Sequence, residues 1–250
     1  MRGCFLVTNY NKQTQIAECL KSLLNQKYHD DLDITMDIII IDDGSIDYSV
    51  DVIRHFEKKY DNIIAYYYSE NAGIGIRRNQ LLTYAENGEY DFAIVFDSDD
   101  IATETLVNNS VNMFEDGGDV FYNSYHHVDY LGEPIGQNFE VEAPDEKDIT
   151  IEEGAGKQNV SHGGLCIKKD FFHVRYPEVK YGEDHAYLYN LMQAGAEFRK
   201  VKVHWNKDHN MLVDAGFFYM RSPDSVSTVH KDEISKHDRE FFRLIAMSKE

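Results

Sequence analysis

Apolar runs alternate with amphipathic segments along the first 100 residues of the chain. Four runs are almost entirely apolar or rich in β-branched and aromatic residues, which is typical of strands buried in a sheet: 4–8, 37–45, 62–68 and 92–96. The segments between them, 14–26, 49–60 and 71–88, place apolar residues at helical spacing, and Thr14 is the expected N-cap of the first. This alternation predicts βαβ units, and therefore an α/β fold whose mixed, mostly parallel sheet is flanked by helices on both faces.

The pattern of elements changes after residue 100. It predicts, in order, a helix over 103–114, a strand over 119–125, a long acid-rich loop region over 129–159, a strand over 164–169, a loop, helix and strand over 181–203, and a terminal helix over 234–248. The terminal helix has a mixed charged face, which favours packing on the core over contact with a membrane. Because neither an internal repeat nor a linker divides the chain, we expect a single domain over residues 1–250.

The charge balance limits the possible partners. The chain has 44 acidic and 25 basic residues, a formal net charge of −19 at pH 7, and no run of Lys or Arg. Nucleic acid and anionic membrane surfaces repel such a chain, so neither is an expected partner. Cys4, Cys19 and Cys166 lie far apart, and no apolar stretch has the length of a secretory leader or a membrane span. We therefore expect a soluble, cytoplasmic protein with reduced, buried thiols.

Polar residues follow three of the predicted strands at the point where each strand ends. They are residues 8–11 after the first strand, Asp42 and Asp43 after the second, and the Asp-Ser-Asp-Asp segment 97–100 after the fourth. Ligands of open α/β sheets bind at this carboxyl edge. If the fourth strand continues through 97–100, its side chains alternate between faces, so that the first and third of these residues share one face.

Two carboxylates on one face repel each other unless a cation lies between them. Mg²⁺ and Mn²⁺ bind carboxylate oxygens and keep coordination positions for phosphate, so Asp97 and Asp99 are candidate metal ligands. The alternative is that these acids cap the following helix, although a cap needs one acid rather than three. Glu183 and Asp184 precede another predicted helix, where they are N-terminal acids or, if a partner and burial raise the pKa of one of them, that one is a general base.

Residues 73–78, Gly-Ile-Gly-Ile-Arg-Arg, begin like the dinucleotide fingerprint G-x-G-x-x-G. Arg78 replaces the third glycine, and the segment follows the third predicted strand rather than the first, which argues against a dehydrogenase. The loop can instead bring an arginine to a phosphate. Arg77 and Arg78 point about 100° apart on a helix, so one of them is expected to face the site, and Arg78 is favoured.

Six motifs in this order resemble the family 2 glycosyltransferases with the GT-A fold: VTNYNK with the IAECLKSLLNQ segment, IIIIDDGSID, NAGIGIRRNQLL, FDSDD, YGEDHAYLYNLMQAG and SPDSVST. The resemblance covers most of residues 4 to about 228. It implies the fold of the nucleotide-diphospho-sugar transferases, with a nucleotide-binding half over about 1–100, an acceptor and catalytic half over about 101–228, and a C-terminal helix over about 229–250.

The resemblance also implies how the donor nucleotide is bound. Thr8 and Tyr10 would flank the base, with the tyrosine ring stacked on it. Asp43 would bind the base, and Asp42 would support Asp43. The chemistry of such a transfer, rather than the resemblance, gives Arg78 its role: the leaving diphosphate gains charge, which the metal and Arg78 would stabilise.

The same resemblance implies the metal site and the catalytic base. Asp97, Ser98 and Asp99 match the family's D-x-D motif, which binds the ribose and the metal–diphosphate, and Asp99 is the first choice of metal ligand. Asp184 matches the general base that deprotonates the acceptor hydroxyl in a single inverting displacement. Members often carry a histidine near the last motif; here His230 lies slightly later, as a candidate metal ligand or phosphate contact, with an ordinary surface histidine as the alternative.

These features predict a metal-dependent, inverting glycosyltransferase. It would use Mn²⁺ or Mg²⁺ and transfer a sugar from a nucleotide-diphosphate sugar, with a UDP-sugar favoured, to a hydroxyl of a glycan or another acceptor. One alternative is a non-catalytic module that binds a nucleotide sugar or a carbohydrate on the same fold, although such a module has no need of Asp184. Another is a nucleotidyltransferase, which usually has a glycine-rich basic loop that residues 8–13 lack.

Overall fold

The main element of the fold is a seven-stranded sheet with the order β3-β2-β1-β4-β8-β6-β9. The computed structural model describes residues 1–29, 32–129, 162–179, 182–202, 204–206, 211–213 and 216–221. The strands of the sheet are β1 (Arg2–Asn9), β2 (Thr35–Asp43), β3 (Ile63–Tyr68), β4 (Phe92–Asp97), β6 (Val120–Tyr122), β8 (Leu165–Lys168) and β9 (Phe198–Lys200). The first four are parallel, β8 runs antiparallel to β4 and β6, and β9 is parallel to β6. The mixed, mostly parallel sheet predicted from the sequence is confirmed.

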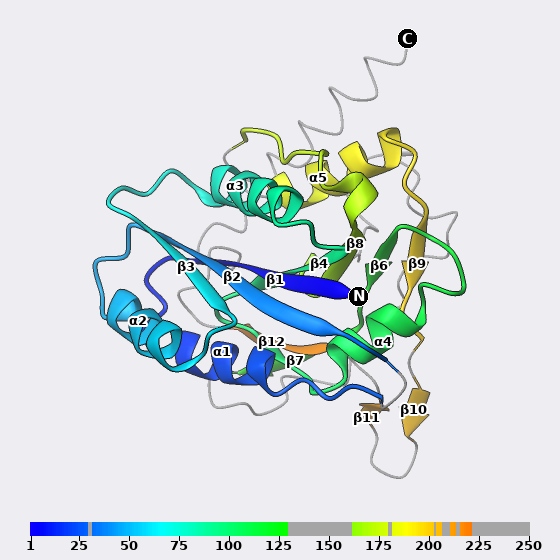
Figure 1. Cartoon of the computed structure of the whole chain (residues 1–250), viewed down its shortest axis with the longest axis horizontal. Coiled ribbons are helices and arrows are strands. Elements are labelled where there is room, and N and C mark those ends of the chain that lie inside the picture. Colours follow the sequence, from blue (N-terminus) through cyan, green and yellow to red (C-terminus); the bar gives the residue numbers. More distant parts are fainter. Residues whose placement is uncertain are drawn as a thin grey trace.

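Helices cover both faces of this sheet (Figure 1). One face carries α1 (Ile16–Leu24), α2 (Ser49–Lys59) and α4 (Leu106–Asn112), and the other carries α3 (Ile74–Asn87) and α5 (Glu183–Gln193). Successive strand residues supply the two cores in turn: Phe5 and Val7 join the first core, whereas Cys4 and Leu6 join the second. Because both faces are buried, the strands read as uninterrupted apolar runs in the sequence.

Two smaller sheets were not predicted from the sequence. One consists of β5 (Ile101–Ala102), β12 (Phe217–Arg221) and β7 (Tyr125–Asp129), and the other of β10 (His204–Asn206) and β11 (Met211–Val213). The strand predicted over 119–125 corresponds to the shorter β6, and its last residue, Tyr125, already begins β7, which belongs to a different sheet. Asn123 lies at the break, where its side-chain amide donates to the carbonyl of Gly164 and to the hydroxyl of Ser110.

Other boundaries also differ from the predictions. The N-cap residue of α1 is Gln15, which makes no side-chain capping bond. The assignment of Thr14 as the cap is therefore wrong, and the Thr14 hydroxyl donates instead to the Gln15 side chain. The helix predicted over 103–114 is shorter and is followed by turns, and a 3₁₀ helix (Lys169–Phe171) follows β8. The three cysteines are buried free thiols, as expected.

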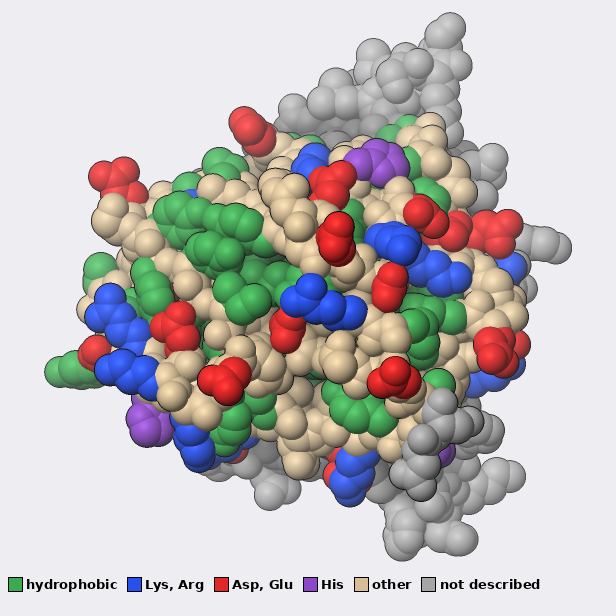
Figure 2. Space-filling view, in the orientation of Figure 1, with side chains coloured by type: hydrophobic (Ala, Val, Ile, Leu, Met, Phe, Trp, Pro, Cys, Tyr) green, Lys and Arg blue, Asp and Glu red, His purple; other side chains and the backbone are tan. Residues whose placement is uncertain are grey.

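Three of the predictions concern residues that the structure does not describe. His230, the terminal helix over 234–248 and nearly all of the loop region over 129–159 lie outside the described residues. Within the described ranges, no helix combines the length and the apolar composition that crossing a membrane requires. Hydrophobic surface is visible over the edge strand β3, between the positions of α3 and α2 (Figure 2).

Candidate active site

The carboxyl ends of the parallel strands form one edge of the main sheet, and the predicted site residues lie along it. In the strand register, Thr8 of β1 is aligned with Asp97 of β4, and Asn9 is aligned with Asp42 of β2. Asp43 is aligned in the same way with Tyr68 at the end of β3. Segments that are far apart in sequence therefore bring their polar ends to one place, as the alternation of strands and helices predicted.

Asp42 holds the turn that follows β2. Its carboxylate accepts hydrogen bonds from the Asn9 side-chain amide at 2.7 Å, from the Ser45 hydroxyl at 2.6 Å and from the Ser45 N–H at 2.9 Å. The side chain is buried. These contacts fix the end of β1 against the turn after β2. Asp42 therefore has a structural role in addition to its predicted role in donor binding.

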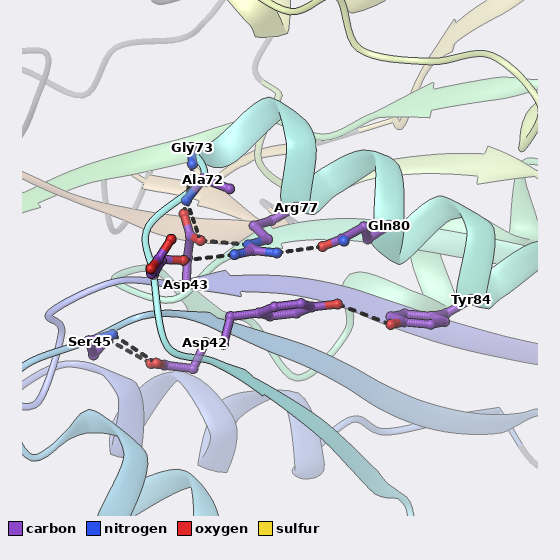
Figure 3. Close-up of polar contacts among 10 residues, drawn as sticks. Asp42, Asp43, Ser45, Ala72, Gly73, Arg77, Gln80 and Tyr84 are labelled. Atoms are coloured by element: carbon purple, nitrogen blue, oxygen red, sulfur yellow. Dashed lines mark hydrogen bonds and ion pairs between the residues drawn. The ribbon is translucent and has the colours of Figure 1, made fainter.

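Asp43 anchors the loop that leads into α3 (Figure 3). Its two carboxylate oxygens accept the N–H groups of Ala72 and Gly73, each at 2.9 Å, and Nε of Arg77 lies 2.5 Å from one of them. The guanidinium of Arg77 also lies 3.6 Å from the ring centroid of Tyr68. Gly73 has a φ of +97°, a conformation that residues with a side chain rarely adopt, which explains the first glycine of the segment 73–78.

Arg78 points to a different partner from Arg77, as their angular separation on the helix predicted. It donates to Asp97 at 2.7 Å and to Glu183 at 2.9 Å, and it is only 4% exposed. Arg78 thus joins the end of β4 to the first residue of α5. Burial raises the pKa of Asp97, but the charge of Arg78, with smaller contributions from His162, outweighs it and leaves that pKa below its ordinary value.

The fourth strand does not continue through residues 97–100, which was the condition for Asp97 and Asp99 to share a strand face. β4 ends at Asp97, and the N–H of Asp100 bonds back to the Asp97 carbonyl, so the following residues form a turn rather than an extended strand. Asp97 contacts Arg78, whereas Asp99 pairs with the ammonium of Lys12 at 2.5 Å. The expectation of one shared strand face is therefore wrong, because a turn, unlike a strand, does not alternate its side chains with a period of two.

The donor atoms of this segment fit a divalent cation only in part. The side chains of Asp97 and Asp99 are 28% and 22% exposed, and their oxygens are of the kind that Mg²⁺ and Mn²⁺ prefer. No group of three or more potential ligand side chains occurs among the described residues. Two carboxylates suit a metal that takes its remaining oxygens from water and a bound diphosphate, which is the arrangement that phosphate-binding Mg²⁺ sites often have.

Asp184 and Glu183 lie in the first turn of α5 and have different environments. Asp184 is partly buried and accepts the N–H of His185 at 2.8 Å. Burial raises the pKa of Asp184, but the nearby His185, His162 and Arg78 more than offset this and lower it. The pKa of Glu183 is raised, mainly by burial. A general base near neutral pH is aided by a raised pKa; Glu183 has this shift but is held in an ion pair with Arg78, whereas the pKa of Asp184 shifts the other way.

The remaining predicted residues also lie at the carboxyl edge of the main sheet, and their roles stay predictions. Thr8 is partly buried in β1, Tyr10 is 44% exposed just beyond it, and Ser98 is buried. Lys12, which pairs with Asp99, was missed by the sequence reasoning. The available signal was its position in the polar segment after the first strand, because that segment ends at the same sheet edge as the D-x-D residues.

His162 and Tyr176 were also missed, and they lie beside the carboxylates. The His162 ring interacts electrostatically with Arg78, Asp184 and Asp97, and its Nε2 lies 2.5 Å from the Tyr176 hydroxyl. The guanidinium carbon of Arg78 lies 5.5 Å from the centroid of the Tyr176 ring. His162 precedes the pair Gly163 and Gly164, a pattern that indicates either a turn or a close approach of the backbone to the donor sugar or acceptor, but it does not single out the histidine. Tyr176 reaches the site only through the tertiary packing.

Comparison with known proteins finds similar sequences. The model of the family described as "Glycosyl transferase family 2" matches residues 4–174. Poly(ribitol-phosphate) beta-glucosyltransferase of Bacillus spizizenii is 29% identical over 220 residues, which are 85% of this chain and 32% of that protein. Putative glycosyltransferase EpsH of Bacillus subtilis is 38% identical over 95 residues, which are 38% of this chain and 25% of that protein. The chain spans about a third or less of the length of these curated relatives.

Solved structures share the fold. S. aureus TarS 1–349 in complex with UDP-GlcNAc superposes with a TM-score of 0.64 at 18% identity, over 90% of this chain and 60% of that chain. Mannosyltransferase PcManGT from Pyrobaculum calidifontis, in complex with GDP-Man and Mn²⁺, gives a TM-score of 0.60 at 13% identity, over 100% of this chain and 64% of that chain. At these identities, the likeness concerns the fold alone.

Proposed function

The chain belongs to glycosyl transferase family 2, and from this membership we propose that it transfers a sugar from a nucleotide-diphosphate sugar to a hydroxyl of a glycan or another acceptor. The observation that carries the proposal is the link through Arg78 between Asp97 and Glu183, next to Asp184. It brings the D-x-D segment, which would hold the donor, next to a carboxylate suited to activate the acceptor. The division into a nucleotide-binding half and an acceptor half remains a prediction.

Each end of the site has a distinct task in this proposal. At the attacking end, Asp184 accepts the proton of the acceptor hydroxyl; it is ionised at neutral pH, and its lowered pKa makes it a weaker base than an ordinary aspartate. At the leaving end, Asp97 and Asp99 are the residues that would hold Mn²⁺ or Mg²⁺, which when bound would supply positive charge to the departing diphosphate. A single displacement between these two ends inverts the anomeric carbon and needs no covalent intermediate.

A UDP-sugar is the favoured donor. The fold neighbour TarS was crystallised with UDP-GlcNAc, and the neighbour PcManGT was crystallised with GDP-Man and Mn²⁺. Both support a nucleotide-diphosphate sugar as the class of donor, and the second supports a divalent metal. We assign base binding to Thr8, Tyr10 and Asp43, all of which lie at the carboxyl edge of the sheet. Asp43 already accepts three hydrogen bonds from the protein, so it would hold the base from a fixed position.

A donor screen tests the proposal. The purified protein is incubated with Mn²⁺ and a panel of nucleotide sugars, with and without a polyol or glycan acceptor, and release of the nucleotide is measured. We expect release above the background rate with a UDP-sugar. Binding of a nucleotide sugar without any release across the panel would instead support the non-catalytic module on the same fold.

Metal dependence is tested by Asp99→Ala. We expect a chelator to abolish transfer by the wild-type protein and added Mn²⁺ to restore it. We expect Asp99→Ala to lower turnover by at least about 100-fold, because metal stabilisation of the departing charge is worth several kcal/mol. The matched control is Asp116→Ala, which removes an acidic side chain whose ion pair with Lys202 lies at the surface. Full Mn²⁺-dependent activity of a folded Asp99→Ala protein would contradict the assignment.

A further inference from the structure

His162 is a buried polar residue to which the proposed reaction assigns no role. It precedes the two glycines that lead into β8, and its side chain is 7% exposed. Its Nε2 lies 2.5 Å from the Tyr176 hydroxyl, whereas its Nδ1 is buried and has no hydrogen-bond partner in the part of the chain that the structure describes. A buried polar atom without a partner destabilises a protein, and native structures pair nearly all such atoms.

The surrounding residues fix the orientation of the His162 ring. The backbone N–H and carbonyl of Tyr176 both bond to the Asn79 side chain, at 2.7 and 2.9 Å, and its ring stacks on Tyr187 with centroids 3.8 Å apart. The imidazole packs edge-on against both tyrosine rings. Rotating the imidazole by 180° would place a carbon beside the Tyr176 hydroxyl and lose that bond. The hydrogen bond to Tyr176 therefore selects the orientation in which Nδ1 has no hydrogen-bond partner.

The ring lies among the residues to which the proposed reaction assigns the donor and the acceptor. Burial and the positive charge of Arg78 lower the pKa of His162 to about 3, while the nearby carboxylates of Asp184 and Asp97 act in the opposite direction. The ring is therefore neutral at neutral pH and acts as a hydrogen-bonding group rather than as a charge. In the proposed reaction, Asp97 lies at the diphosphate end and Asp184 at the attacking end, so the sugar has to lie between them.

We propose that Nδ1 of His162 forms a hydrogen bond with a hydroxyl of the sugar that is transferred, and that His162 thereby helps to select the donor. The inference rests on the proposed function, because it takes the positions of donor and acceptor from that function. A sugar hydroxyl can donate to or accept from an imidazole nitrogen, so a bound pyranose completes the pairing that the protein leaves open. His162 therefore contributes to the affinity for a nucleotide sugar and not to the affinity for UDP alone.

Two amide substitutions of His162 test the contributions of its two ring nitrogens separately. The longer side chain in His162→Gln reaches the position of Nε2 and keeps the contact with Tyr176, whereas the shorter one in His162→Asn places its amide at the position of Nδ1. Affinities for UDP-glucose, UDP-GlcNAc and UDP are measured by titration calorimetry, and thermal melting checks that each variant is folded. For the sugar nucleotide that the wild type binds best, we expect His162→Gln to weaken affinity and raise KM about tenfold, as for one lost hydrogen bond, with UDP affinity unchanged.

His162→Asn should stay within about threefold of the wild type for the same sugar nucleotide. Tyr176→Phe is the matched control, because it removes the contact that His162→Asn loses and keeps the imidazole. Without that contact the ring can still turn Nδ1 to the sugar hydroxyl, so its affinity should also stay within about threefold. A folded His162→Gln protein with wild-type affinities, or with equally weakened sugar nucleotide and UDP binding, would overturn the inference. So would loss of sugar-nucleotide binding by a folded His162→Asn protein. A wild type that binds a UDP-sugar but transfers nothing would refute the proposed function, while the calorimetry would still decide the His162 contact.

Discussion

Replacement of Asp184 by asparagine is expected to lower the rate of sugar transfer by about 10²–10⁴-fold, the usual contribution of a general base. The amide cannot take up the proton of the acceptor hydroxyl at neutral pH. Its oxygen can still accept the N–H of His185, the bond that the carboxylate makes at the start of α5, so the fold should survive. Steady-state rates of nucleotide release in the presence of an acceptor, together with thermal melting, measure both effects.

The affinity for the donor shows whether Asp184→Asn removes only the general base or also disrupts the donor site. The affinity of Asp184→Asn for the nucleotide sugar is expected to remain within about threefold of the wild type, because the donor nucleotide would bind at the ends of β1, β2 and β4. Asp170→Asn, which changes an exposed acid of the 3₁₀ helix, is the control for a generic loss of negative charge. Turnover of Asp184→Asn within tenfold of the wild type would contradict its assignment as the base, and Glu183→Gln would then identify or exclude the neighbouring carboxylate.

The position of these residues at one sheet edge was predictable because it depends on local signals. The run that ends at Asp97 is apolar and short enough for a strand, and the strands that end at Asn9 and Asp43 have the same pattern. Parallel alternation with helices then places all of their carboxyl ends together, wherever each strand lies in the sheet. The family motifs add to this signal and are found in the same order along the chain.

The contacts within the site were not predictable, because they join residues that are far apart in sequence. Arg78 reaches Glu183, 105 positions away, only because α3 and α5 cover the same face of the sheet. The turn after Asp97 is a local feature that the periodicity argument missed: an apolar run indicates where a strand lies, but not that it stops at the first acid. Likewise, β7 and β12 pair across more than 80 positions, and no period in the sequence signals that pairing.

Removal of the Arg78 charge in Arg78→Met is expected to lower the free energy of unfolding by about 3–5 kcal/mol, the usual cost of leaving a buried ionic partner unpaired. Asp97 and Glu183 both pair with this guanidinium, and methionine offers neither of them a hydrogen bond. The matched control is Lys202→Met, since the ion pair of Lys202 with Asp116 lies at the surface and should be worth no more than about 1 kcal/mol. Urea denaturation of the two variants measures the difference, and equal stability would contradict the role of Arg78 as a buried link.

A second substitution shows whether Arg78 acts only as this link. Adding Glu183→Gln to Arg78→Met removes one of the two unpaired carboxylates, so the double variant is expected to regain part of the lost stability, as interacting residues do. If Arg78 only fixes the end of β4 relative to α5, turnover should recover in parallel with stability, because Asp184 returns to its place next to the donor. If Arg78 also stabilises the departing diphosphate, as the sequence predicts, turnover should stay low while stability recovers. Since Arg78 lies between the residues assigned to the donor and those assigned to the acceptor, this comparison separates holding the site together from stabilising the charge that leaves it.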